Sequence, residues 1–252
     1  MLPILFRDEH IIAIHKPAGL LVHRSELDRN ETRFAVQLLR DQIGQHVHPV
    51  HRLDKGTSGI LVFALDRSTA ALLGSQFESR AVIKHYLAVV RGHPAATGHI
   101  DYPLSRRRDD AERSRHAASD APQPAITDFT RLATIELPWA IDRYPRSRYA
   151  LLALAPKTGR RHQLRRHMKH IAHPIIGDAT FGKGIHNRSF QERLDSHRLL
   201  LACVEMTFTH PASGKPVLLT APPSEDFSAL LGRLGWTEAL PVSWRNNRSI
   251  NG

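Results

Sequence analysis

Short apolar runs bounded by turn residues recur along the whole chain, separated by single helical segments at irregular intervals. Strand-like runs cover residues 11–14, 60–64, 84–90, 149–155, 199–208 and, after a turn at 211–214, residues 217–219. Apolar side chains at helical spacing mark residues 32–43, residues 161–171 and a segment that begins at Asp66. A doubly wound fold would alternate strand and helix regularly, and this chain does not. The pattern therefore predicts an α+β fold, with a mostly antiparallel central sheet flanked by helices and loops.

The patterned segments divide the chain unevenly. Residues 1–225 contain all of the runs above and are expected to form one domain. Residues 226–252 are expected to add a C-terminal helix and a loosely ordered polar tail after Trp236. Residues 105–124 hold no large apolar side chain and many charges, which predicts a mobile surface loop.

Charge and cysteine content narrow the classes of function. The 252 residues include 35 Lys and Arg against 24 Asp and Glu, a net charge of +11. Such an excess favours a polyanionic partner such as a nucleic acid, although a general preference for arginine gives the same balance. One cysteine, Cys203, excludes an intrachain disulfide and fits a reducing compartment. Because no stretch approaches the ~20 apolar residues of a membrane span, we expect a soluble, cytoplasmic protein.

A single carboxylate lies in a basic, glycine-containing segment. Asp54 follows Arg52, precedes Lys55, and is followed by glycines at 56 and 59. Glycine lets a backbone approach a ligand closely, and nearby cations keep an aspartate ionised, which suits a nucleophile. A structural Asp–Arg pair on a turn would leave the same pattern, and these residues alone favour that simpler interpretation.

A second basic segment follows at residues 156–167. It contains Lys157, Arg160, Arg161, His162, Arg165, Arg166 and His167. Four arginines this close cannot all be buried unpaired. They form either a solvated basic face or a phosphate-contacting helix with one arginine turned inward to hold a carboxylate. The same arginines would repel a cation, so we predict no metal site at these histidines.

Several motifs, taken in order, resemble the RluA-type family of pseudouridine synthases. They are residues 16–19, 51–59, 84–92, 158–165, 173–178 and 210–214. The resemblance spans roughly residues 1–225, which would then be the catalytic domain. The S4 RNA-binding module that precedes this domain in some relatives is expected to be absent.

The resemblance implies roles for particular residues. Asp54 matches the family's catalytic nucleophile, Arg165 the arginine that pairs with it, and Tyr86 the active-site tyrosine that stacks on the base. Arg52 matches the arginine that enters the stack as the uridine leaves. RNA contacts are expected from Arg52, Lys157, Arg160, Arg161 and His162. One position departs from the family, because Ala202 stands where relatives often carry histidine.

The implied reaction detaches uracil from C1′ of the ribose, rotates it and rejoins it through C5, which requires no cofactor. The nucleophile would attack either C6 of the base or C1′ of the ribose, and the sequence leaves both open. Residues 21–25, 40–46, 143–145 and 167–178 look most like the members that modify uridine 65 of tRNA. The expected partner is tRNA, with no membrane or protein partner implied and a monomeric state. The alternatives are a ribosomal RNA synthase, a non-catalytic RNA-binding protein and, more remotely, a metal-dependent hydrolase.

Overall fold

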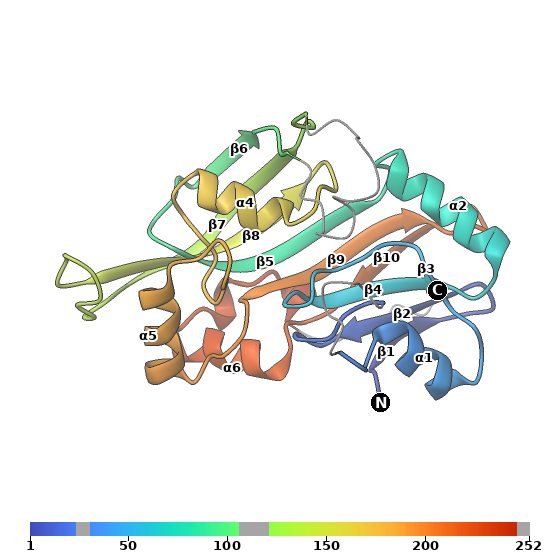
Figure 1. Ribbon diagram of the computed structural model, residues 1–252, viewed down its shortest axis with the longest axis horizontal. Coiled ribbons are helices and arrows are strands. Elements are labelled where there is room, and N and C mark those ends of the chain that lie inside the picture. Colours follow the sequence, from blue (N-terminus) through green and yellow to red (C-terminus); the bar gives the residue numbers. More distant parts are fainter. Residues whose placement is uncertain (24–30, 106–120, 246–252) are drawn as a thin grey trace.

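The structure is a computed structural model, and it describes residues 1–23, 31–105 and 121–245. Within these ranges one sheet runs through the molecule, with strand order β1-β2-β4-β9-β5-β8-β7-β6 (Figure 1). Two further strands lie off this path, β10 beside β9 and β3 beside β4. The strands are β1 (Ile4–Arg7), β2 (Ile11–Lys16), β3 (His48–Pro49), β4 (Ser58–Ala64), β5 (Ile83–Arg91), β6 (Thr97–Asp101), β7 (Ile126–Leu137), β8 (Ser147–Pro156), β9 (Leu201–Thr209) and β10 (Pro216–Thr220).

Antiparallel pairing dominates this sheet. Between the named strands of the described residues, every pairing is antiparallel except that of β4 with β9, where Ser58 lies beside Ala202 and Gly59 beside Cys203. That short parallel contact joins the strands of the N-terminal quarter to the rest of the sheet. The predicted α+β fold with a mostly antiparallel sheet is confirmed.

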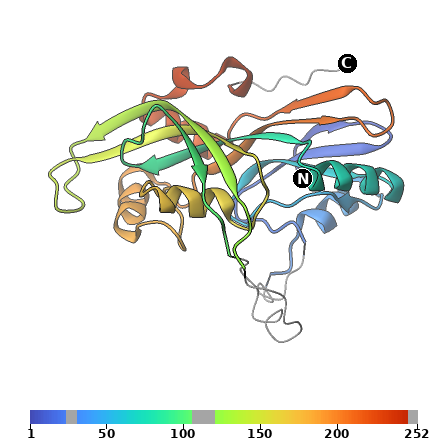
Figure 2. The same ribbon diagram turned by 90° about the horizontal axis from the view of Figure 1, so that it is seen from above.

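The helices pack beside the sheet. They are α1 (Ala35–Ile43), α2 (Arg67–Glu78), α4 (Gln163–His170), α5 (Gly184–Leu194) and α6 (Glu225–Arg233), followed by the short 3-10 helices η2 (Thr237–Ala239) and η3 (Val242–Trp244). Helix α2 packs against β3 and β4, and α4 packs against β8. Figures 1 and 2 both show the long β7–β8 hairpin projecting at one end of the molecule. Among the helices that the structure describes, none is long and apolar enough to cross a bilayer.

Both faces of the central strands are buried. In β5 the side chains of Tyr86, Ala88 and Val90 belong to one hydrophobic core. Leu87 and Val89, which alternate with them, belong to a second core on the opposite face. Successive side chains of a strand point to opposite faces, so one strand supplies both cores. The rigid centre of the sheet therefore holds Tyr86 in place.

Most of the expected elements are present. The strands and the 211–214 turn are found near the expected positions, and the helices expected at 32–43 and 161–171 span Ala35–Ile43 and Gln163–His170. Asp66 caps α2 as predicted, since its Oδ1 accepts a hydrogen bond from the Thr69 amide at 2.8 Å.

The sequence patterns missed β1, β3, β6, β7 and α5. Helix α5 has weak apolar spacing because two of its three buried residues, His186 and Ser189, are polar. The expectation of a loose tail after Trp236 is wrong for residues 237–245, because Leu240 and Trp244 anchor them in the second core. Residues 246–252 lie outside the described residues, as do residues 106–120 of the predicted mobile loop.

Candidate active site

Asp54 lies in a tight loop directly before β4. The Thr57 amide donates to the Asp54 carbonyl at 3.0 Å, and the Gly19 amide donates to the Lys55 carbonyl at 2.8 Å. Beneath this loop, the fully buried Lys16 donates from Nζ to the carbonyls of Pro17 at 2.8 Å, Leu20 at 2.7 Å and Lys55 at 3.2 Å. Lys16 therefore joins the loop of Asp54 to the turn after β2.

Burial also changes the proton affinity of Lys16. Desolvation lowers its pKa to about 7, and the charge of nearby Asp54 opposes that change. The resemblance included residues 16–19 but assigned Lys16 no role. The sequence feature that could have identified Lys16 is its position at the end of an apolar strand, immediately before a proline.

Arg165, from α4, reaches Asp54 across the chain. Its Nη1 lies 3.3 Å from Asp54 Oδ2, although the two residues are 111 positions apart in sequence. The same guanidinium donates through Nε and Nη2 to the carboxylate of Asp178, at 2.7 and 2.8 Å. This two-bond pairing is the stronger of the two contacts and orients the guanidinium.

The side chain of Asp178 is fully buried. Its Oδ1 also accepts from the amides of Thr180 and Phe181, both at 2.9 Å. Burial alone would raise the pKa of Asp178, but the hydrogen bonds from Arg165 and the amides outweigh it and lower the pKa. Asp178 thus acts through Arg165 as a positioning residue, a role that sequence reasoning missed.

Tyr86 and Asp54 line a common pocket of about 430 Å³. Tyr86 is 9% exposed, and burial raises its pKa well above the usual value for a phenol. Arg165 lines the same pocket, with apolar walls from Phe77, Leu164 and Leu201. The structure therefore brings together the three residues proposed as catalytic from the sequence.

A larger cleft of about 780 Å³ adjoins this pocket. Both cavities are lined by Arg52, Asp54, Arg161, His162 and Arg165. The carboxylate thus lies where a small, partly apolar pocket meets a wide basic cleft. Arg160 lines only the smaller pocket. Lys157 lines neither cavity and instead lies 3.3 Å from Asp128, so the structure places it apart from the other predicted RNA contacts.

A buried glutamine fixes the basic loop between β8 and α4. The Oε1 of Gln163 accepts from the Thr158 hydroxyl at 2.7 Å and from the Arg160 amide at 3.0 Å. Its Nε2 donates to the Ile126 carbonyl at 2.9 Å and to the Thr127 hydroxyl at 3.0 Å. This network anchors the loop on which His162 lies, with its Nε2 3.8 Å from Asp54 Oδ1.

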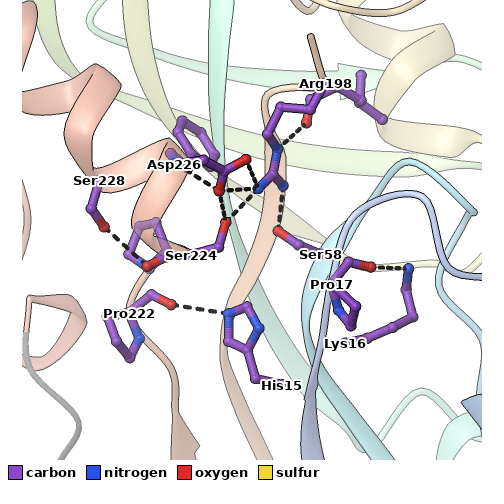
Figure 3. Close-up of polar contacts among 12 residues, drawn as sticks. His15, Lys16, Pro17, Ser58, Arg198, Pro222, Ser224, Asp226 and Ser228 are labelled. Atoms are coloured by element: carbon purple, nitrogen blue, oxygen red, sulfur yellow. Dashed lines mark hydrogen bonds and ion pairs between the residues drawn. The ribbon is translucent and has the colours of Figure 1, made fainter. Parts of the chain in front are cut away.

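Arg198 lines the larger cleft and makes the polar contacts drawn in Figure 3. It donates to the Ser58 hydroxyl at 2.5 Å, and its Nη1 lies 3.0 Å from Asp226 Oδ1 and also contacts the Ser224 hydroxyl. These contacts tie the start of α6 to the first residue of β4. The charge of Arg198 is thus engaged within the protein, and the residue supports the strand that follows the Asp54 loop.

His167, in the second basic segment, hydrogen-bonds to groups within the fold. His167 contacts the Thr127 hydroxyl at 2.9 Å and the Tyr102 carbonyl at 3.1 Å. In the part of the chain that the structure describes, no three His, Cys, Asp or Glu side chains gather as metal ligands.

Comparison with known proteins identifies the family. The model of the RNA pseudouridylate synthase family matches residues 10–170. The chain is 47% identical over 241 residues to a tRNA pseudouridine synthase C from Yersinia pestis, covering 96% of this chain and 94% of that protein. It is 46% identical over 236 residues to one from Haemophilus influenzae, covering 94% and 99%. The chain belongs to the RNA pseudouridylate synthase family.

Solved structures of this family share the fold. Human RNA pseudouridylate synthase domain containing 4 aligns with a TM-score of 0.69 and 26% identity, covering 92% of this chain and 93% of that one. Human RNA pseudouridylate synthase domain containing 1 aligns with a TM-score of 0.67 and 26% identity, covering 88% and 83%. The family resemblance expected from the motifs is confirmed.

Ala202, the position that departs from the motif of the RluA-type members, is buried inside the fold. Its side chain belongs to the second core, with Leu87 beside it on β5. Cys203, one residue on, faces the first core with Tyr86. Position 202 therefore lies on the side of the sheet away from the Tyr86 pocket.

Proposed function

We propose that the protein isomerises uridine to pseudouridine in tRNA, with Asp54 as the nucleophile. One observation carries this assignment: Asp54, Arg165 and Tyr86 converge on a single pocket that opens into a basic cleft. The pocket, at about 430 Å³, is of a size that holds small ligands. A base turned out of its stack fits that description, and the cleft provides cations for the RNA backbone.

The target base must leave the RNA stack before it can be rotated. Extrusion costs a few kcal/mol, which contacts in an enzyme pocket offset. Tyr86 would supply a flat aromatic surface for the extruded uracil, and the exposed Arg52, which lines both cavities, would fill the vacated space.

Asp54 then forms a covalent bond to the nucleotide, at C6 of the base or C1′ of the ribose. The bond between N1 and C1′ breaks, the uracil rotates, and a bond forms between C5 and C1′. The bond between Asp54 and the nucleotide then breaks and returns the free carboxylate. The C5 proton is lost to solvent while N1 gains one, so atoms and electrons balance without a cofactor. Arg165, held by Asp178, orients the Asp54 carboxylate and stabilises its charge.

Arg52, Arg160, Arg161 and His162 are placed to contact the RNA around the target base, and we include Lys157 as a more distant contact. Lysine and arginine release counterions from the RNA, so binding should weaken steeply as salt is added. We propose that the enzyme acts as a monomer without a protein partner. With tRNA as the substrate, we place the enzyme in the cytoplasm.

Within tRNA we propose uridine 65, in the T-stem, as the target. The deep, narrow major groove of A-form RNA is closed to side chains, so the enzyme would find this site by shape and phosphate contacts. The test compares intact tRNA, an isolated T-arm hairpin and a ribosomal RNA fragment, with pseudouridine mapped in each. Modification of uridine 65 in tRNA and hairpin is expected. Preference for the ribosomal fragment would favour a ribosomal RNA synthase, and binding without pseudouridine in any RNA would favour a non-catalytic RNA-binding protein.

A further inference from the structure

Lys84 is a cation of the smaller pocket to which the reaction assigns no role. It lies on β5 two residues before Tyr86, so both side chains leave the same face of the strand. Both line the pocket that contains Asp54. Side chains two residues apart on a strand are roughly 7 Å apart, which is comparable to the length of a pyrimidine ring with its substituents.

The ammonium of Lys84 lacks an acceptor in the part of the chain that the structure describes. Among the described residues, no hydrogen bond or ion pair holds its Nζ, which lies 5.7 Å from the centre of the Phe77 ring. Lys84 is half-buried, and this burial lowers its pKa.

The neighbouring histidine does not supply that acceptor. His51 stacks on Phe77 with ring centres 4.7 Å apart, and its Nε2 already accepts from the Val62 amide at 3.0 Å. Desolvation lowers the pKa of His51 to about 3, so its ring is neutral at physiological pH and adds no charge beside Lys84. The pocket thus presents three N–H donors of one ammonium toward whatever enters it.

We propose that Lys84 Nζ donates a hydrogen bond to a carbonyl oxygen of the extruded uracil and is a specificity-determining residue of the base pocket. The inference rests on the proposed function. Flat and apolar walls from Tyr86, Phe77 and Leu164 suit a base better than a phosphate. Lysine donates and cannot accept, so it matches the two carbonyls of uracil and would oppose the amino group of cytosine.

The experiment removes each partner of this hydrogen bond separately. Lys84→Met deletes the charge at similar volume, and Lys84→Gln keeps a neutral donor. Lys215→Met, in the exposed β9–β10 turn, is the matched control. Each protein is tested in single-turnover assays on tRNA that carries uridine, 2-thiouridine or 4-thiouridine at the target, because sulfur accepts hydrogen bonds weakly.

Lys84→Met should lower the single-turnover rate on uridine-containing tRNA roughly ten- to hundredfold, which is the effect expected from losing a hydrogen bond from a charged donor. The rate of Lys84→Gln should fall less than that of Lys84→Met, and the rate of Lys215→Met should equal that of the unaltered protein. One thio substitution should slow the unaltered enzyme but have no further effect on Lys84→Met, which identifies the oxygen contacted. Thermal melting is followed alongside, and the Gln variant tests the inference if the Met variant fails to fold.

Three results would overturn the inference. An unchanged rate for Lys84→Met would exclude a functional contact. Equal thio effects in the unaltered and Lys84→Met enzymes would exclude a contact with the base carbonyl. In the third result, the binding of Lys84→Met to tRNA would depend less on salt, by about the amount expected for one phosphate contact, and the thio effect would be retained. Lys84 would then contact the RNA backbone and not the base.

A binding measurement separates this inference from the proposed function. Lys84→Met should weaken binding of tRNA with uridine at the target while binding of tRNA with an abasic target is unchanged. This comparison requires no turnover. Absence of pseudouridine with the unaltered protein would reject the proposed function, and equal weakening for both RNAs would reject the role of Lys84.

Discussion

Arg165 holds Asp178 with two hydrogen bonds of 2.7 and 2.8 Å and reaches Asp54 with a single longer one of 3.3 Å. The buried carboxylate thus fixes the guanidinium, and the guanidinium presents an N–H group of Nη1 to the partly exposed carboxylate. Arg165 therefore has two carboxylate partners with different roles. Asp178 holds the arginine in place, and Asp54 is the proposed nucleophile. The role of Asp178 can therefore be tested by protein stability, and the role of Asp54 by catalytic rate.

Replacing Asp178 with Asn should destabilise the fold. Removing one partner of a buried pair costs about 3 kcal/mol or more, because the other charge stays behind. The folded-state pKa of Asp178 is lowered, so its contribution is fully present above the unfolded carboxyl pKa of about 3.9 and is lost as pH falls through the folded value. Urea unfolding should therefore show a large difference in the free energy of unfolding between the unaltered protein and Asp178→Asn at pH 7. That difference should narrow below about pH 4. A difference in the free energy of unfolding that does not change with pH would contradict the ion pair between Asp178 and Arg165.

Replacing Arg165 with Lys should lower the chemical rate more than RNA affinity. Lysine keeps the charge but cannot bond Asp178 through two parallel N–H groups while also facing Asp54. The Arg165 side chain is only 12% exposed, which limits its contact with the RNA backbone. Single-turnover rates and equilibrium binding give the two values, with Arg146→Lys on the exposed β7–β8 hairpin as control. Weakened binding with an unchanged rate would reassign Arg165 to phosphate contact.

Replacing Gln163 with Leu should destabilise the protein by at least about 2 kcal/mol. The change removes the hydrogen bonds of Gln163 to the buried hydroxyls of Thr158 and Thr127, and also those to two partly buried backbone groups. Gln76 is a matched control, since it also bridges backbone groups, at Thr209, but in an exposed position. Gln76→Leu should cost less than about 1 kcal/mol in the same unfolding assay. Equal losses would show that the network around Gln163 adds nothing beyond an ordinary surface contact.

Replacing Gly177 with Ala should disturb the site through the backbone. Gly177 has φ +79°, and a Cβ there would lie 1.8 Å from the Arg198 carbonyl oxygen. Gly214 has φ +68° with nothing within 4 Å of a Cβ, so Gly214→Ala isolates the backbone cost of about 1 kcal/mol. We expect Gly177→Ala to lose about 2 kcal/mol more than that in thermal or urea unfolding. Similar losses at the two glycines would contradict the close approach of the Arg198 backbone to Gly177.

The sequence predicted Asp54, Tyr86 and Arg165 because each lies in a motif of its own, and family resemblance joined the motifs. It could not predict the role of Gln163, because two of its partners lie in an element with a weak pattern. It missed Asp178 because the resemblance paired Arg165 with Asp54 and assigned it no second carboxylate. Gln163 bonds Ile126 and Thr127 at the start of β7, a strand with only two buried side chains. Long-range contacts of this kind leave no periodic signal in the chain.

The central claim is that Asp54 performs covalent catalysis on uridine in tRNA, and release of tritium from 5-tritiated uridine tests it directly. Asp54→Asn keeps the size of the side chain but replaces the carboxylate with an amide that is not a competent nucleophile. The unaltered protein should release tritium from tRNA, and the variant should release none above background while still binding that tRNA. Release by Asp54→Asn within tenfold of the unaltered rate would contradict the claim.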